Sequence, residues 1–173
     1  ARYVYNWGLD EWKRQYEAWK TDSGLPKPSE GALRRQLNGI KHDNFPWMLE
    51  VTKFASAQAV GNLGVAFKNF FAGTARKPRF KKKGMGDSFR YPDPKQIKHD
   101  QANSRLFLPK LGWLRYRNSR EVLGELRNVT VSQSGGKWFV SIQTQREVEQ
   151  PVHPSTRIVG IDMNPDGSMD CAF

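Results

Sequence analysis

The hydrophobic period of this chain changes once along its length, and that change limits the possible folds more than any other feature. In residues 1–72 the apolar side chains recur every three or four positions, which is the spacing of one face of an α-helix. In residues 105–150 short runs of branched and aromatic residues alternate with polar ones, which is the pattern of half-buried strands. Helices followed by strands, with no internal repeat, predict an α+β fold.

Local signals indicate where the helices begin and end. The first apolar stripe consists of Tyr5, Leu9, Trp12, Tyr16 and Trp19, and Ser23-Gly24 stops it. Ser29 and Thr52 are suited to cap the next two long helices, because a hydroxyl oxygen can accept hydrogen bonds from free backbone amides. We also expect Pro46 to open a short helical turn and Gly73 to end the last helix.

Strands are expected in the second half of the chain. The segments with strand character are Arg105–Leu108, Trp113–Arg117, Leu126–Gln133, Lys137–Gln145 and Arg157–Met163. Ser134-Gly135-Gly136 predicts a hairpin, and the alternation of Trp138, Val140 and Ile142 with Phe139, Ser141 and Gln143 predicts one buried face after it. Residues 73–104 are rich in proline, glycine and lysine, so we expect a loop-rich linker or an extended arm there.

The chain carries a large excess of positive charge. It has 28 Lys and Arg against 17 Asp and Glu, a formal net charge of +11. Because such an excess repels itself in the folded state, it usually marks an anionic partner, and nucleic acid is the first candidate. A membrane-bound protein would need a basic amphipathic helix, a lipidation motif or an apolar run long enough to span a bilayer, and we find no such motif or run.

Much of this charge lies in residues 75–98, which we term the basic arm. It holds nine Lys or Arg against two Asp, a net +7. Cations can bind a phosphate backbone, and the interleaved rings of Phe80, Phe89 and Tyr91 can stack on unpaired bases. The arm therefore favours nucleic-acid contact, and the alternative is a solvated loop whose aromatic residues anchor it to the core. The candidate contacts are Arg76, Lys77, Arg79, Lys81, Lys82, Lys83 and Arg90.

One acidic residue, Asp162, stands inside an apolar segment, Ile158–Met163. A carboxylate buried there is costly unless it binds a cation or accepts hydrogen bonds. Ribonuclease-H-like nucleases carry such an Asp on their first strand, where paired Mg²⁺ ions can stabilise the attacking and leaving oxygens of a phosphodiester. Asp162 is therefore a candidate catalytic and metal-binding residue, and the alternative is that it ends the strand and caps a turn.

The other candidate ligands are few. His42, His99 and His153 lie in polar or proline-containing stretches and are expected at the surface, and Cys171 is expected to be a passive thiol. A single cysteine excludes a disulfide framework or a cysteine zinc cage within these residues.

Several short motifs follow one another from Arg2 to Asp162. They are Arg2–Trp7, Pro46-Trp47, Ala66–Phe71, Pro78–Lys83, Asp87–Pro92, Leu108–Trp113, Asn128–Val131, Gly136–Ile142 and Gly160–Asp162. The first has the form R-x-V-Y-N-W. In order and spacing, the series resembles TnpB proteins, the transposon-encoded RNA-guided nucleases related to type V CRISPR effectors. No single block is decisive, but together they are specific.

The resemblance implies a domain arrangement. A helical recognition lobe (residues 1–72) would be inserted in a wedge-type β-barrel (residues 73–152), followed by the first strand of a RuvC/RNase H-like domain (residues 156–173). The family's first barrel strand would precede Arg2, and the later Glu and Asp of the nuclease site and a four-cysteine zinc ribbon would follow Phe173. We therefore expect these residues to be part of a longer protein and to be inactive alone.

The resemblance also implies a function, that of an RNA-guided DNA endonuclease. Its partners would be a guide RNA and target double-stranded DNA, with Mg²⁺ in the complete nuclease site and zinc only in the ribbon outside this chain. Lys53 and Phe54 fall on positions associated with reading a short DNA motif beside the target, and Asp162 falls on the first metal-binding Asp. The barrel and the basic elements would hold the guide RNA. The implied location is a prokaryotic cytoplasm, associated with the nucleoid and with no membrane partner.

The sequence departs from the family pattern in two places. Ala57 occupies a slot that commonly holds Gln, while Gln58 lies about one hundred degrees further around the helix, so the DNA motif can differ. Asn164 replaces the Gly that usually follows the nuclease strand, and residues 165–170 do not resemble the usual second strand. Either residues are omitted after Asn164 or the nuclease domain has diverged, so a nuclease-dead RNA-guided DNA-binding repressor stays open as an alternative. A stand-alone RNA-binding module is a second alternative.

Overall fold

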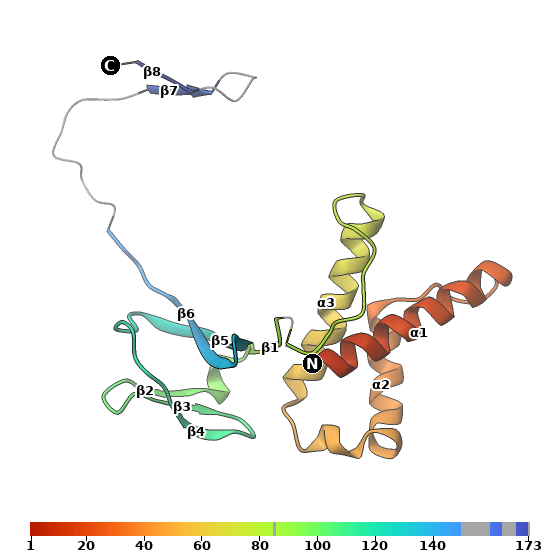
Figure 1. Ribbon diagram of the computed structural model, residues 1–173, viewed down its shortest axis with the longest axis horizontal. Coiled ribbons are helices and arrows are strands. Elements are labelled where there is room, and N and C mark those ends of the chain that lie inside the picture. The colour runs from red at the N-terminus through yellow and green to blue at the C-terminus, as the bar shows by residue number, and fades with distance from the viewer. Residues whose placement is uncertain (85, 150–159, 164–168, 173) are drawn as a thin grey trace.

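The computed structural model describes residues 1–84, 86–149, 160–163 and 169–172 (Figure 1). Helices occupy the first part of the chain and strands the second, so the structure is α+β. The helical lobe contains α1 (Arg2–Thr21), α2 (Glu30–Asn44), the short 3-10 helix η1 (Pro46–Leu49) and α3 (Lys53–Phe71).

The helix boundaries follow the predicted capping residues. Ser29 Oγ accepts a hydrogen bond from the Ala32 amide at 3.2 Å, and Thr52 Oγ1 accepts one from the Phe54 amide at 3.4 Å. Both predicted N-caps are therefore confirmed. Gly73 has a φ of +74° just beyond α3, a conformation that glycine adopts without strain, and its amide donates to the Phe70 carbonyl at 3.0 Å.

The predicted apolar stripe of α1 packs against α3. Leu9 and Trp12 are buried, and the Trp12 ring is stacked on Phe67 with 4.2 Å between ring centroids. The two helices approach closely at Gly8, where an added Cβ would lie 3.0 Å from Leu63 Cδ2. The other members of this buried core are Val4, Tyr5, Leu33, Leu37, Met48, Ala59 and Val60.

Two three-stranded antiparallel sheets form the β lobe, in the strand orders β1–β5–β6 and β2–β3–β4. Their bounds are β1 (Ser88–Tyr91), β2 (Lys98–Asp100), β3 (Arg105–Leu108), β4 (Gly112–Arg115), β5 (Glu125–Ser134) and β6 (Lys137–Gln145), and the 3-10 helix η2 (Pro94–Gln96) precedes β2. One core spans both sheets and consists of Tyr91, Ile97, Leu106, Leu108, Val129 and Val131.

The strand predictions from residue 105 to 145 are confirmed. Residues 73–104, where we expected a loop-rich linker or an extended arm, also contain two short strands that were not predicted, β1 and β2. β1 has only four residues, is followed by a proline and pairs with β5, where Tyr91 stands opposite Val129. Its residues, Ser-Phe-Arg-Tyr, alternate polar and aromatic side chains, but a run of four is too short to distinguish a strand from a loop.

The β5–β6 hairpin is confirmed, and one side chain near its tip departs from expectation. Gly135 and Gly136 both have positive φ, 54° and 75°, as a tight two-residue hairpin turn requires. Val140 and Ile142 pack against the β core, but Trp138 is 61% exposed. Its cross-strand neighbour is Gln133, so this end of the hairpin extends beyond the apolar core.

The expectation that all three histidines are at the surface is wrong for His99. It is half-buried, because it stands opposite the buried Leu106 on β3, and its Nε2 lies 2.7 Å from Tyr116 Oη. His42 is exposed as expected, and His153 lies outside the described residues.

Phe54 joins the helical lobe to the β lobe. It belongs to the first turn of α3, and its ring meets the Tyr91 ring edge-on, with 6.2 Å between centroids. Tyr91 is fully buried, and its hydroxyl donates to the Pro109 carbonyl at 3.1 Å. The first turn of α3 is thus fixed against the core of the β lobe.

Near the C-terminal end, β7 (Gly160–Met163) and β8 (Met169–Ala172) form an antiparallel pair in which Asp162 stands opposite Asp170. The part of the predicted strand before Gly160 lies outside the described residues. Among the strands that the structure describes, neither three-stranded sheet closes on itself. The wedge-type barrel and the boundaries at 1–72, 73–152 and 156–173 stay predictions.

Candidate nucleic-acid interface

The first part of the basic arm is fixed to α1 by one asparagine. Asn6 Nδ2 donates to the Lys81 carbonyl at 3.0 Å, and the Lys81 amide donates to Asn6 Oδ1 at 2.8 Å. A side-chain amide that satisfies both backbone groups of one residue fixes that residue in place. The arm is therefore held at a defined point on the helical lobe, although Asn6 and Lys81 are 75 positions apart in the chain.

An ion pair holds the arm at a second point. Arg2 Nη1 donates to both carboxylate oxygens of Asp87, at 2.9 and 2.7 Å. The Gly84 amide also donates to Asp87, at 3.0 Å. These contacts lower the pKa of the Asp87 carboxyl, the Gly84 hydrogen bond most and then the Arg2 charge, so Asp87 is an anion at neutral pH.

Two lysine–aromatic contacts complete the attachment. Lys81 Nζ lies 4.5 Å from the centroid of the Tyr5 ring, and Lys13 Nζ lies 4.4 Å from that of Phe80. Arg2, Tyr5 and Asn6 all come from the first turns of α1. We call the set formed by Arg2, Tyr5, Asn6 and Lys13 of α1 with Phe80, Lys81 and Asp87 of the arm the strap.

The attachment leaves the predicted contact residues of the arm facing solvent. Arg76, Lys77, Arg79, Lys82 and Lys83 are exposed, and none of them forms an ion pair with any described residue. Phe89 and Tyr91 of the arm, in contrast to these cations, are turned toward the protein core. Tyr91 is fully buried and Phe89 packs half-buried beside it, so these two rings anchor the arm to the core.

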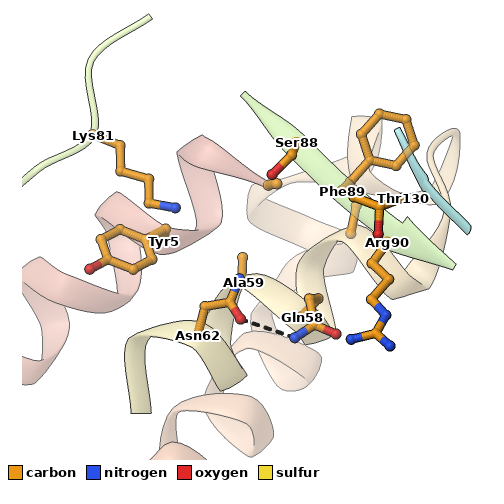
Figure 2. Close-up of a pocket in the computed structure, with 11 residues that line it drawn as sticks. Tyr5, Gln58, Ala59, Asn62, Lys81, Ser88, Phe89, Arg90 and Thr130 are labelled. Atoms are coloured by element: carbon orange, nitrogen blue, oxygen red, sulfur yellow. Dashed lines mark hydrogen bonds between the residues drawn. The ribbon is translucent and has the colours of Figure 1, made fainter. Parts of the chain in front are cut away.

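A small cavity of about 190 Å³ lies where the arm, α3 and β1 meet (Figure 2). Its polar lining includes Gln58, Asn62, Lys81 and Arg90, and Gln58 Nε2 donates to Asn62 Oδ1 at 3.0 Å. Figure 2 shows Lys81 beside Tyr5, and Arg90 on the Gln58 side of the cavity. Amide and guanidinium groups can hydrogen-bond to base edges and phosphates, so this lining suits a nucleic acid.

Arg90, another predicted contact residue, is exposed on β1 and is held by neighbouring amides. Its Nε donates to Asn128 Oδ1 at 3.1 Å and its Nη2 to Gln143 Oε1 at 3.4 Å. Asn128 is buried, and its Nδ2 donates in turn to the same Gln143 oxygen. The guanidinium is thereby oriented while it stays within reach of a ligand.

A second hollow, of about 260 Å³, lies at the N-terminal end of α3. It is lined by Lys41, Met48, Leu49, Val51, Thr52, Lys53, Phe54, Ser56, Gln96, Pro109 and Lys110. Three of these are lysines from three different segments, and the positive end of the α3 dipole lies beside them. Lys53 is exposed, with its Nζ 5.5 Å from the Phe54 ring, whereas Phe54 is half-buried. The hollow thus combines cationic side chains with apolar ones such as Met48 and Leu49.

The structure places Asp162 in β7 but does not describe its side chain. Within the part of the chain whose side chains are described, no group of three His, Cys, Asp or Glu residues could hold a metal ion. No described helix is long and apolar enough to cross a membrane.

Sequence reasoning identified the cations but missed the residues that position them. Asn6 offered one weak signal, because asparagine is a poor residue for a helix interior unless its amide has a specific partner. The pair Gln58 and Asn62 offered another, since residues four apart lie on one face of a helix.

Comparison with known proteins shows what the chain is similar to. The chain is 56% identical over 116 residues to the protein named "Putative RNA-guided DNA endonuclease InsQ" of Escherichia coli (strain K12). The match covers 67% of this chain and 28% of that relative, so the matched residues span less than a third of its length. No protein-family model matches the chain.

Proposed function

This chain belongs to the TnpB family, and from that premise we propose that the protein is an RNA-guided DNA endonuclease whose described lobes bind the guide RNA and contact target DNA. The observation that carries the proposal is the fixed, cation-rich arm beside a polar cavity, at the junction of the two lobes. Base pairing between the guide RNA and the target DNA would select the target sequence, while the protein would contact the nucleic-acid backbone and recognise the shape of the duplex. Such a protein would act at the nucleoid.

The arm is proposed to bind the guide RNA. Arg76, Lys77, Arg79, Lys82 and Lys83 supply unpaired charge along one short stretch of chain. Each cation that contacts a phosphate releases condensed counterions, so binding gains free energy at low salt. The strap holds the stretch against α1 before RNA arrives, which reduces the entropy lost on binding.

The hollow at the start of α3 is proposed to contact the DNA motif beside the target. Lys53 is exposed next to the helix N-terminus, where phosphates are favoured, and Lys41 and Lys110 add charge around the same hollow. Phe54 would hold the first turn of α3 in position under this surface, because its half-buried ring packs against Tyr91 of the β lobe.

Cleavage is proposed to require Asp162 as a Mg²⁺ ligand. Carboxylate oxygens suit Mg²⁺, and the β7–β8 register sets a second carboxylate residue, Asp170, opposite Asp162. Bound Mg²⁺ would stabilise the charge that develops on the phosphodiester oxygens.

The test pairs a cleavage assay with a gel-shift assay on the full-length protein loaded with guide RNA. Asp162→Ala should abolish cleavage and leave guided DNA binding nearly unchanged. Asp10→Ala, which removes an exposed carboxylate from α1, is the matched control and should cleave like the wild type.

The remaining outcomes separate the alternatives. Guided DNA binding without wild-type cleavage would identify a nuclease-dead repressor. Tight RNA binding without guided DNA binding would identify a stand-alone RNA-binding module. Full cleavage by Asp162→Ala would mean that the active site lies elsewhere.

A further inference from the structure

The outer face of the β2–β3–β4 sheet carries a row of one cation and two aromatic rings, in which Lys98 and Trp113 are exposed and Phe107 is half-buried. The strand register aligns Lys98 on β2 with Phe107 on β3 and Trp113 on β4. The two rings meet edge-on with 5.7 Å between centroids, and Lys98 Nζ lies 5.9 Å from the Phe107 centroid. Trp113 is 52% exposed, so much of its ring is open to solvent.

The next row on the same face adds charge. Two positions along each strand, the register aligns Asp100, Arg105 and Arg115, because residues two apart on a strand share a face. Arg105 and Arg115 are exposed, whereas the Asp100 carboxylate accepts hydrogen bonds from the backbone amide and side chain of Asn103, at 3.1 and 2.8 Å. The face therefore presents three cations, and its one anion is already engaged in a turn.

Folding does not account for these rings. The opposite face of the sheet supplies the core with Leu106 and Leu108, both fully buried, together with Leu114. An aromatic pair on the solvent side adds little to that core. An open ring such as Trp113, with cations two positions away, suits single-stranded nucleic acid, since rings stack on unpaired bases while cations contact the phosphates.

We propose that this face, defined by Lys98, Arg105, Phe107, Trp113 and Arg115, binds an unpaired segment of the guide RNA, with one base stacked on Trp113. The inference rests on the proposed function. Bases inside a duplex expose only their edges, so stacking on Trp113 requires an unpaired nucleotide. The guide RNA is the constant partner of the protein, whereas unpaired DNA arises only after the target has been opened.

The test measures guide RNA affinity of the full-length protein in the absence of DNA. Trp113→Ala should weaken it by roughly 5- to 150-fold, the range for loss of one base–aromatic stack. Trp113→Phe, which retains a ring, should restore most of the affinity. Trp138→Ala is the matched control, since Trp138 is also an exposed Trp on a strand but lies in the other sheet, and it should leave affinity unchanged.

Ultraviolet cross-linking of the protein bound to both guide RNA and target DNA then tests which nucleic acid stacks on Trp113. We expect the cross-link to join Trp113 to an unpaired nucleotide of the guide RNA. Unchanged affinity in Trp113→Ala, or a cross-link to the displaced DNA strand, would overturn the inference. A wild-type protein that binds no guide RNA would overturn the proposed function itself. Circular dichroism of Trp113→Ala should match the wild type, because the ring is on the solvent side, and a misfolded variant would show that the ring is structural.

Discussion

Removing the Asn6 amide should loosen the attachment of the basic arm to α1. Asn6→Ala deletes the hydrogen bonds from Asn6 Nδ2 to the Lys81 carbonyl (3.0 Å) and from the Lys81 amide to Asn6 Oδ1 (2.8 Å). At about 0.5–1.5 kcal/mol each, the pair contributes about 1–3 kcal/mol. Both hydrogen bonds lie in an exposed place, where the released groups can bond to water instead, so we take about 1–2 kcal/mol.

The remaining strap contacts cannot replace this pair. The ion pair between Arg2 and Asp87 is partly exposed, with side-chain exposures of 33% and 25%, so it contributes at most about 1 kcal/mol. The Lys81 amide should therefore exchange its hydrogen about 5- to 30-fold faster in Asn6→Ala, which is the factor equivalent to 1–2 kcal/mol. Guide RNA affinity should fall by no more than the same factor.

The salt dependence of RNA binding identifies the cause of that loss. Asn6→Ala keeps every cation of the arm, so the slope of log affinity against log salt should stay unchanged while affinity falls. Asn6→Asp keeps the acceptor but loses the donor and should be intermediate. Asn38→Ala on α2, which removes an amide bonded only to nearby Lys41, is the matched control. Wild-type amide exchange at Lys81 together with wild-type RNA affinity in Asn6→Ala would refute the strap.

Three further changes test other parts of the structure. Replacing the lysines at 81–83 by Ala should weaken guide RNA binding and flatten its salt slope by up to roughly two to three units, and an unchanged slope would place these lysines in bulk solvent. Lys53→Ala should weaken binding of motif-bearing DNA more than it weakens guide RNA binding, whereas Lys68→Ala, near the other end of α3, should change neither. Equal loss of DNA and RNA binding in Lys53→Ala would reject a specific contact between Lys53 and the DNA motif. Gly124→Ala should lower the free energy of unfolding by about 2–4 kcal/mol in a denaturant titration, because Gly124 has a φ of +86° and an added Cβ would lie 2.6 Å from the Gln145 carbonyl oxygen. Wild-type stability would show that the β5–β6 region can shift to accept the methyl group.

The helical lobe could be predicted because its signals are local. A stripe such as Leu9 and Trp12 repeats within one helix, and the caps Ser29 and Thr52 act within three residues of themselves. The strands from β3 to β6 also carry their own alternation. β1 also alternates polar and aromatic residues, but over only four positions, and its fourth residue, Tyr91, is buried where β5 pairs beside it.

The candidate site was predictable in its charges but not in its geometry. Lysine and arginine density in the arm is visible in the sequence, and so is its excess over acidic residues. The contacts that position the arm join residues 75 and 85 places apart, Asn6 with Lys81 and Arg2 with Asp87. Periodicity says nothing about such pairs, because each partner is a single polar residue and its contact lies far away in the sequence.

The two aspartates of the arm explain how a loop this basic can be ordered and still bind an anion. Asp87 is held by the Gly84 amide and by Arg2, which lies outside the arm. Asp93 accepts hydrogen bonds from the Lys95 amide at 3.1 Å and from Gln96 Nε2 at 2.7 Å, and so caps η2. Both carboxylates are thus engaged by backbone amides and neighbouring side chains, and neither forms an ion pair with any of the arm's nine Lys and Arg. The acidic residues fix the shape of the arm without neutralising its cations, so its net charge of +7 stays available to a phosphate backbone.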